Sequence, residues 1–255
     1  MLGIKGWQEP RFVSMVYLTL IVFAEVAIIY NVSLGILLHS VILFALLIHG
    51  SLMEVGLNKF LISLSLAPLI RILSITMPLS YFSLNMWFYI ISICVLAAAF
   101  ACIYLQGVSP FQVGIKLPRW RDLPWEIAVI VIAVPFGIVE YLILKPDPLI
   151  FVSLTTLLSV SLMLIVSTGF MEELVFRGLI QHHSTNNLGF WGVPFVAVLF
   201  GSLHIGNVSI ADFILTTAVG LVFGMTVRRT GSILGVTISH GLINIILFLV
   251  APFYL

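Results

Sequence analysis

Two adjacent glutamates and an arginine interrupt a long apolar stretch in the segment Thr168-Gly-Phe-Met-Glu-Glu-Leu-Val-Phe-Arg-Gly-Leu179. Charge buried in hydrocarbon is costly unless it is paired or faces water. On a helix, Glu173 and Arg177 have the i, i+4 spacing at which a carboxylate meets a guanidinium, whereas Glu172 points about 100° away. We therefore expect Glu173 to bind Arg177 and Glu172 to be free for general acid or base chemistry. A purely structural clamp between helices is the alternative.

Further polar residues follow at similar depth on later apolar segments. His204 ends the motif Phe200-Gly-Ser-Leu-His204, and His240 and Asn244 lie four residues apart on another segment. An i, i+4 pair projects from one helix face, as two donors aimed at one oxygen must. At ~1.5 Å per residue, these side chains and Glu172 lie about 12 to 21 Å from their helix ends, which places them in one layer.

The composition indicates an integral membrane protein. Of 255 residues, 61% are hydrophobic and 8% charged, whereas a soluble domain carries about 25% charged residues. The net charge of +1 gives no indication of nucleic-acid binding. Cys94 and Cys102 are too far apart on one predicted helix to form a disulfide with each other.

Apolar segments of spanning length predict an all-α, polytopic transmembrane bundle of eight to nine helices with an intramembrane polar cavity. The polar linker 106–124 divides residues 1–124, leading helices and an interfacial loop, from residues 125–255, the helices expected to do chemistry, within one membrane domain. The segments are 12–30, 32–49, 60–77, 82–105, 125–144, 149 to about 183, 190 to about 204, 210–227 and 232–251. The seventh is short.

The basic residues define an orientation. If the segments alternate across the bilayer, one side holds only Lys145 of these basic residues. The other side holds Lys5, Arg11, Lys59, Lys116, Arg119, Arg121, Arg228 and Arg229. Because basic residues are enriched on the cytoplasmic side, we expect this second side, which includes the N-terminus, to be cytoplasmic.

Other polar residues receive structural interpretations. Asp212 follows Ser209 by three, the spacing of a helix cap, and Glu140 lies near a span end from which it is expected to reach the interface. The remaining polar residues in the apolar segments of the leading half have no sequence spacing that pairs them, and we expect them to be packing or gating groups; they are Glu25, His39, His49 and Arg71. A pair of Glu25 with Arg71 across two helices is the alternative.

Three motifs in order resemble the CAAX protease and bacteriocin-processing family of intramembrane proteases: Glu172-Glu173-x-x-x-Arg177, Phe200-x-x-x-His204 and His240-x-x-x-Asn244. The resemblance covers about 159–249 and implies an endopeptidase with a cavity open to the cytosol. It implies that Glu172 and His204 activate a water, that His240 and Asn244 stabilise the oxyanion, and that Glu173 and Arg177 support them. A structure in which Glu173 faces the two histidines would reverse the assignment of the glutamates.

The role of metal stays open at this point. The family is often grouped with metalloproteases, but the chain has no His-Glu-x-x-His motif. We expect no cofactor, because Asn244 is a poor zinc ligand and a good oxyanion donor; if zinc is bound, the expected ligands are Glu172, His204 and His240.

The expected partners are the lipid bilayer and a peptide or prenylated-peptide substrate. Alternatives are a transporter or proton relay, since membrane glutamates and histidines also conduct protons, a bacteriocin-immunity or peptide-maturation role, and an inactive scaffold. The polar residues are concentrated in the last third of the chain, and their pattern is not repeated in the first third. This asymmetry favours the enzyme over a transporter, because transporters are commonly built from two similar halves.

Overall fold

The computed structural model describes residues 7–78, 81, 84–148 and 154–255. These residues form helices and no strand. In chain order the elements are α2 (Pro10–Tyr30), α3 (Val32–Ser51), α4 (Val55–Leu64), α5 (Leu66–Thr76), α6 (Leu84–Leu105), η1 (Trp120–Asp122), α7 (Leu123–Leu144), α8 (Leu154–Leu164), η2 (Ile165–Phe170), α9 (Met171–Glu173), η3 (Leu174–Ile180), α10 (Gln181–Leu188), η4 (Gly189–Trp191), α11 (Gly192–Ser202), η5 (Ile205–Asn207), α12 (Ile210–Thr230), α13 (Leu234–Ile245), η6 (Ile246–Val250) and α14 (Ala251–Tyr254).

Within the described residues, eight helical stretches are long and apolar enough to cross a membrane. The predicted all-α bundle of eight to nine helices is thereby confirmed. The sixth stretch, Leu157–Asn207, combines the sixth and seventh predicted segments. The third begins at Val55, five residues before the prediction, and the predicted starts at 82 and 149 lie outside the described residues.

A glycine divides the sixth stretch. At Gly189 the backbone turns with φ +62, a conformation that glycine adopts at little cost. The following α11 has 11 residues, about 16 Å, whereas a crossing needs about 20 residues. We infer that α11 ends inside the apolar layer and leaves His204, directly after it, at that depth.

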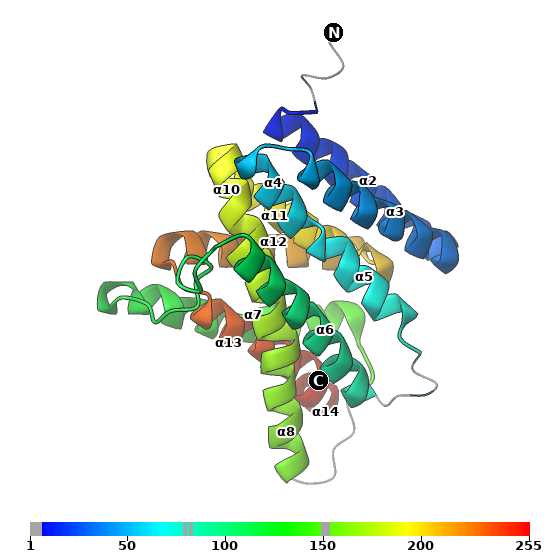
Figure 1. The fold of residues 1–255 in the computed structure, drawn as a ribbon. Helices are drawn as coiled ribbons and strands as arrows, with labels where there is room; N and C mark the ends of the chain where they lie inside the picture. The colour runs from blue at the N-terminus through cyan, green and yellow to red at the C-terminus, as the bar shows by residue number, and fades with distance from the viewer. Residues whose placement is uncertain (1–6, 79–80, 82–83, 149–153) are drawn as a thin grey trace.

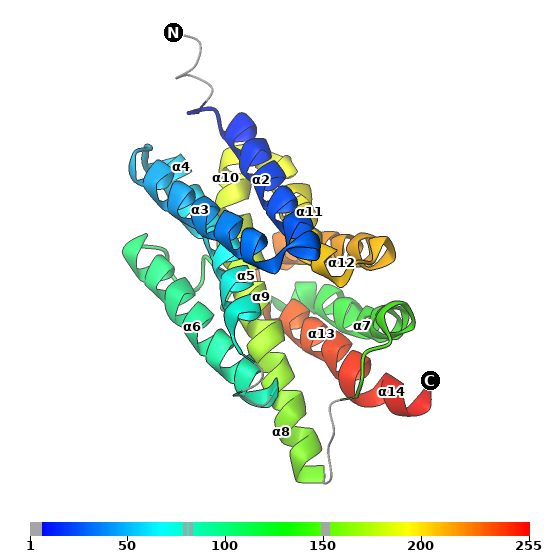
Figure 2. The ribbon, with the colours of Figure 1, turned by 90° about the vertical axis from the view of Figure 1, so that its right-hand side faces the viewer.

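A long rod of α8, η2, α9, η3 and α10, stacked end to end, runs through the bundle (Figure 1). Figure 2 shows that α3 and α6 lie on one side of this rod and that α7, α12 and α13 lie on the other. Both η2 and η3 are π-helical, with the three residues of α9 between them. Insertions of this kind occur often at functional sites. The paired glutamates are in α9, at the centre of the rod.

Two glycines permit α13 to cross the rod with the two backbones in contact. A Cβ atom added to Gly169 would lie 2.5 Å from the carbonyl oxygen of Thr237, and one added to Gly241 would lie 2.6 Å from the Ile165 side chain. Side chains on either glycine would force the helices apart. This close crossing brings His240 next to the glutamates of α9.

Small residues on α12 have a similar effect. A Cβ atom added to Gly220 would lie 3.2 Å from Cα of Ala197 on α11. At Gly224, the Gln181 side chain donates to the backbone carbonyl at 2.9 Å. The Gly220-Leu-Val-Phe-Gly224 motif thus lets α12 approach both α11 and the rod.

Candidate active site

Glu173 is the centre of a fully buried ion cluster. Its Oε1 atom accepts a hydrogen bond from Nη1 of Arg177 at 2.9 Å, with both side chains 0% exposed. The same oxygen lies 2.8 Å from Nδ1 of His240. The predicted Glu173–Arg177 pair is present, but the contact with His240 was not predicted, because it depends on the close crossing of α13 over the rod.

Glu172 has a different environment, although it is the neighbouring residue. Its side chain is 24% exposed and lines a cavity of about 160 Å³ together with His204 and Thr168. At ~30 Å³ per molecule, this volume accommodates several waters. Glu173 faces one of the two histidines and lies outside this cavity, whereas Glu172 shares the cavity with the other. The geometry is therefore compatible with the division of roles that the resemblance implies, and it does not reverse it.

His240 and Asn244 both point from α13 toward the rod, as their spacing predicted. Nδ2 of Asn244 donates to Oγ1 of Thr168 at 2.8 Å, and Nε2 of His240 is 3.9 Å from Oε2 of Glu172. Neither residue is among those that line the cavity. The four candidate catalytic residues therefore lie in one region of the bundle. Glu172 and His204 line the cavity, and His240 and Asn244 lie next to two of its lining residues, Glu172 and Thr168.

Phe200 separates the two histidines. Its ring centroid lies 5.4 Å from that of His204 and 5.9 Å from that of His240, edge-on to the latter at 86°. The guanidinium carbon of Arg177 lies 4.4 Å from the same ring, in the geometry of a cation–π contact. The sequence motif included Phe200 only as a position one turn before His204, and nothing in its spacing indicated this bridging role.

The leading helices contribute a charged residue to the cavity. Arg71, which lines it, donates from Nε at 2.6 Å and from Nη2 at 2.9 Å to the two carboxylate oxygens of Glu25. His39 Nε2 is 3.1 Å from the same carboxylate, with both side chains 0% exposed. Sequence spacing alone did not pair these residues, and the structure joins Glu25 to Arg71 and His39. Their partners lie on different helices, where sequence spacing carries no information.

Apolar side chains of the leading half complete the cavity wall, among them Ile70, Trp87, Phe88 and Ile91. The candidate site therefore lies between the two halves of the chain, with the motif residues on one side and the leading helices on the other.

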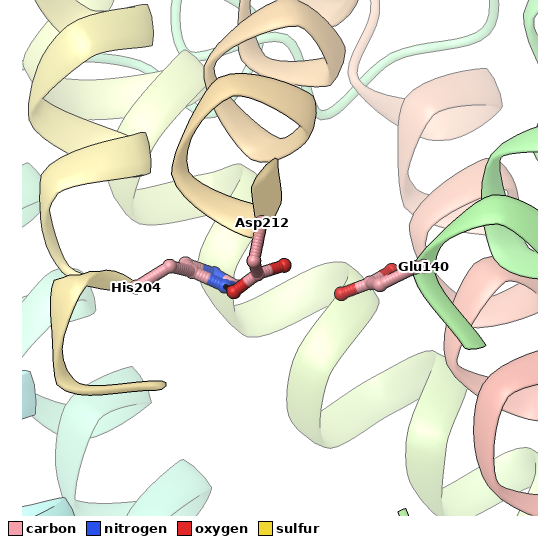
Figure 3. Close-up of side chains that lie close together, drawn as sticks. All are labelled: Glu140, His204 and Asp212. Carbon is pink, nitrogen blue, oxygen red and sulfur yellow. Dashed lines mark ion pairs between the residues drawn. The ribbon is translucent and has the colours of Figure 1, made fainter. Parts of the chain in front are cut away.

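Glu140 and Asp212 also differ from their predicted positions. Ser209 caps α12, since its Oγ atom accepts from the Asp212 backbone N–H at 3.2 Å, but the Asp212 carboxylate turns toward His204, 3.4 Å away. Glu140 is 8% exposed and does not extend to an interface as expected. Figure 3 shows Glu140 approaching His204 and Asp212 from a separate helix. Two carboxylates that were assigned to capping and to the interface therefore lie beside a candidate catalytic histidine.

The ligands expected for zinc do not converge in this structure. Glu172, His204 and His240 are not among the sets of three whose ligand atoms all lie within 4.8 Å; in the part of the chain that the structure describes, the set that meets this limit is Glu140, His204 and Asp212. Phe200, packed between the two histidines, keeps His204 and His240 apart. We therefore assign no step of the reaction to a metal held by Glu172, His204 and His240.

These features define an integral, multi-pass membrane protein with ionisable residues buried between its helices. Residues 154–246 match the family model described as type II CAAX prenyl endopeptidase Rce1-like. This match confirms the resemblance found in the motifs, and it supports a role as a protease. No curated protein and no solved structure matches the chain.

Proposed function

We propose that this protein is an intramembrane endopeptidase of the CAAX type, in which Glu172 and His204 activate a water molecule. One observation carries the proposal: of two adjacent glutamates, Glu173 is fully buried and bound to Arg177 and His240, while Glu172 lines a cavity with His204. A general base must have access to water and substrate, and the 24% exposed side chain of Glu172 supports this role better than the fully buried side chain of Glu173.

The proposed reaction uses the positions of these residues. A water molecule held between Glu172 and His204 gives a proton to Glu172 as its oxygen attacks the carbonyl carbon of the scissile peptide bond. The tetrahedral oxyanion is stabilised by hydrogen bonds from His240 and Asn244. Glu172 then returns the proton to the leaving nitrogen, the C–N bond breaks, and a carboxylic acid and an amine leave; the acid ionises by losing its proton to the amine or to water. Glu173 holds His240 through its Nδ1 atom, which directs Nε2 of the same ring toward the side of Glu172.

The apolar part of the cavity supports a substrate that enters from the membrane. Trp87, Phe88 and Ile91 line it on the side opposite the motif residues, as a lipid-modified or apolar peptide would require. A prenylated CAAX peptide, cleaved on the C-terminal side of its modified cysteine, is the substrate class that we propose. The orientation with a cytoplasmic N-terminus, supported by the distribution of Lys and Arg, places the polar end of such a peptide on the cytosolic side.

The test uses purified full-length protein in liposomes with a farnesylated CAAX peptide and the same peptide without the lipid. We expect wild-type protein to release the C-terminal tripeptide from the farnesylated form, and Glu172→Gln to reduce the rate at least ~100-fold. Glu54→Gln is the matched control, because Glu54 is exposed and its side chain caps no helix. Full activity of Glu172→Gln would overturn the mechanism. Proton flux across the liposomes without cleavage would instead support the relay alternative.

A further inference from the structure

Glu140, His204 and Asp212 converge from three separate elements. Glu140 is in the last turns of α7, His204 follows α11, and Asp212 is in the first turn of α12. One ligand atom from each lies within 4.8 Å of the other two. In Figure 3 one Asp212 oxygen points toward the His204 ring and the other points toward Glu140. Metal–ligand bonds of about 2.0–2.2 Å allow separations of this size after small side-chain movements.

The cluster of Glu140, His204 and Asp212 contains no arginine or lysine among the described residues, whereas the buried clusters around Glu25 and Glu173 each contain an arginine. The Glu25 carboxylate contacts Arg71 and His39, and that of Glu173 contacts Arg177 and His240. In contrast, no lysine or arginine in the described part of the chain forms an ion pair with Glu140 or Asp212, and His204 is shared between two carboxylates. A single protonated histidine cannot neutralise both.

Asp212 has an unsatisfied acceptor aimed into the cluster. Its side chain is 0% exposed, Asn207 donates to Oδ2 at 2.8 Å, and Oδ1 has no hydrogen-bond partner among the described residues. Nδ1 of His204 lies 3.4 Å from Oδ2 of Asp212 but forms no hydrogen bond among the described residues. Buried groups of this kind cost about 1–3 kcal/mol or more when they are left unpaired. A cation between the three side chains would satisfy these atoms and supply the missing charge together.

We propose that Glu140, His204 and Asp212 bind one divalent transition-metal ion, of the Zn²⁺ or Mn²⁺ type. An imidazole nitrogen with two carboxylates suits these ions, whereas Mg²⁺ favours oxygen ligands alone. Glu140 and Asp212 are not among the residues that line the cavity, although His204 is. The ion therefore lies behind His204 and fixes its ring through Nδ1, which leaves Nε2 for the cavity. This site differs from the set Glu172, His204 and His240, and it does not depend on the protein being a peptidase.

The test measures metal content, so that it is separate from any assay of cleavage. Full-length Cys94→Ala/Cys102→Ala protein in detergent is stripped with chelator and titrated with Zn²⁺, Mn²⁺ or Mg²⁺. We expect one Zn²⁺ or Mn²⁺ per chain by calorimetry and elemental analysis, a higher unfolding temperature, and no response to Mg²⁺. Asp212→Asn and Glu140→Gln should each weaken binding at least tenfold, while Glu172→Gln and His240→Ala still bind one ion.

The variants make the result decisive even if one fails to fold, because Glu140 and Asp212 are on different helices and are tested independently. Absence of stoichiometric Zn²⁺ and Mn²⁺ binding in folded wild-type protein overturns the proposal. Loss of binding in Glu172→Gln or His240→Ala, with unchanged affinity in Asp212→Asn and Glu140→Gln, also overturns it and assigns the ion to the other set. Cleavage of peptide has no bearing on either outcome.

Discussion

Oε1 of Glu173 lies 2.8 Å from Nδ1 of His240, and the same oxygen accepts a hydrogen bond from Arg177 at 2.9 Å. One carboxylate thus joins the rod to α13 and neutralises a guanidinium that is itself fully buried.

Glu173→Gln should destabilise the protein by about 3–5 kcal/mol, because it leaves Arg177 buried without a counter-charge. The measurement is the free energy of unfolding in detergent. Arg177→Met in the same chain should recover a large part of the loss, since both charges are then removed. If the double variant is as unstable as the sum of the single variants, the two side chains are not coupled.

Asn244→Ala should lower kcat about 10²- to 10³-fold if Asn244 donates to the oxyanion. Thr168→Val removes the same Asn244–Thr168 hydrogen bond but keeps the amide donor. It should therefore reduce kcat by much less, and the two rates are compared on the farnesylated peptide. Equal losses in the two variants would mean that Asn244 acts only by holding the helices together.

Gly169→Ala should cost about 1–3 kcal/mol, because its Cβ atom would lie 2.5 Å from the backbone oxygen of Thr237 and α13 would have to move. Gly56→Ala is the matched control, with its nearest neighbour atom 3.7 Å from the added Cβ. We expect this control to unfold at the wild-type temperature or slightly above it. Equal stability of Gly169→Ala and Gly56→Ala would contradict the close crossing.

Arg71→Met should destabilise the protein by about 3–5 kcal/mol, since Glu25 is 0% exposed and loses its arginine. Arg121→Met is the comparison: its side chain is 71% exposed and lies 3.9 Å from Asp122, so about 0–1 kcal/mol is expected. Thermal unfolding of both variants in the same detergent checks the difference. A small effect at Arg71 would show that His39 alone compensates Glu25.

Single cysteines at positions 117 and 147 should be labelled from opposite sides of the membrane. Leu117 is 83% exposed in the basic loop before α7, and Asp147 is exposed after it. In a Cys94→Ala/Cys102→Ala background, a membrane-impermeant maleimide added to right-side-out cells should label Asp147→Cys and spare Leu117→Cys until the cells are opened. The reverse pattern would invert the predicted orientation.

The parts of the structure that follow from local physics could be predicted from sequence. Apolar length alone gave the number of spans to within one, and the i, i+4 spacing predicted the pairing of Glu173 with Arg177. Contacts between helices could not be predicted in this way. Glu25 and Arg71 are 46 residues apart, and only the packing of three helices brings their side chains and that of His39 together.

Other differences between prediction and structure arise because the same residue type can take more than one role at a given position in a helix. The spacing of Ser209 and Asp212 correctly indicated a helix start, but the carboxylate was free to turn toward His204. Similarly, the position of Glu140 near a helix end implied access to the interface, and only its neighbours show that it is buried. Phe200 gave no signal of its function, because an aromatic residue in an apolar helix is the common case.

The wall of the cavity that lies across from the motif residues comes from α5 and α6, through Ile70, Arg71 and Trp87, and these residues precede the segment 154–246 that matches the family model. Substitutions there can change which substrates enter without touching the residues proposed to carry out hydrolysis. Exchange of α5 and α6 between relatives would therefore be a route by which one reaction acquires new substrates. The reacting groups can stay constant while selection acts on their surroundings.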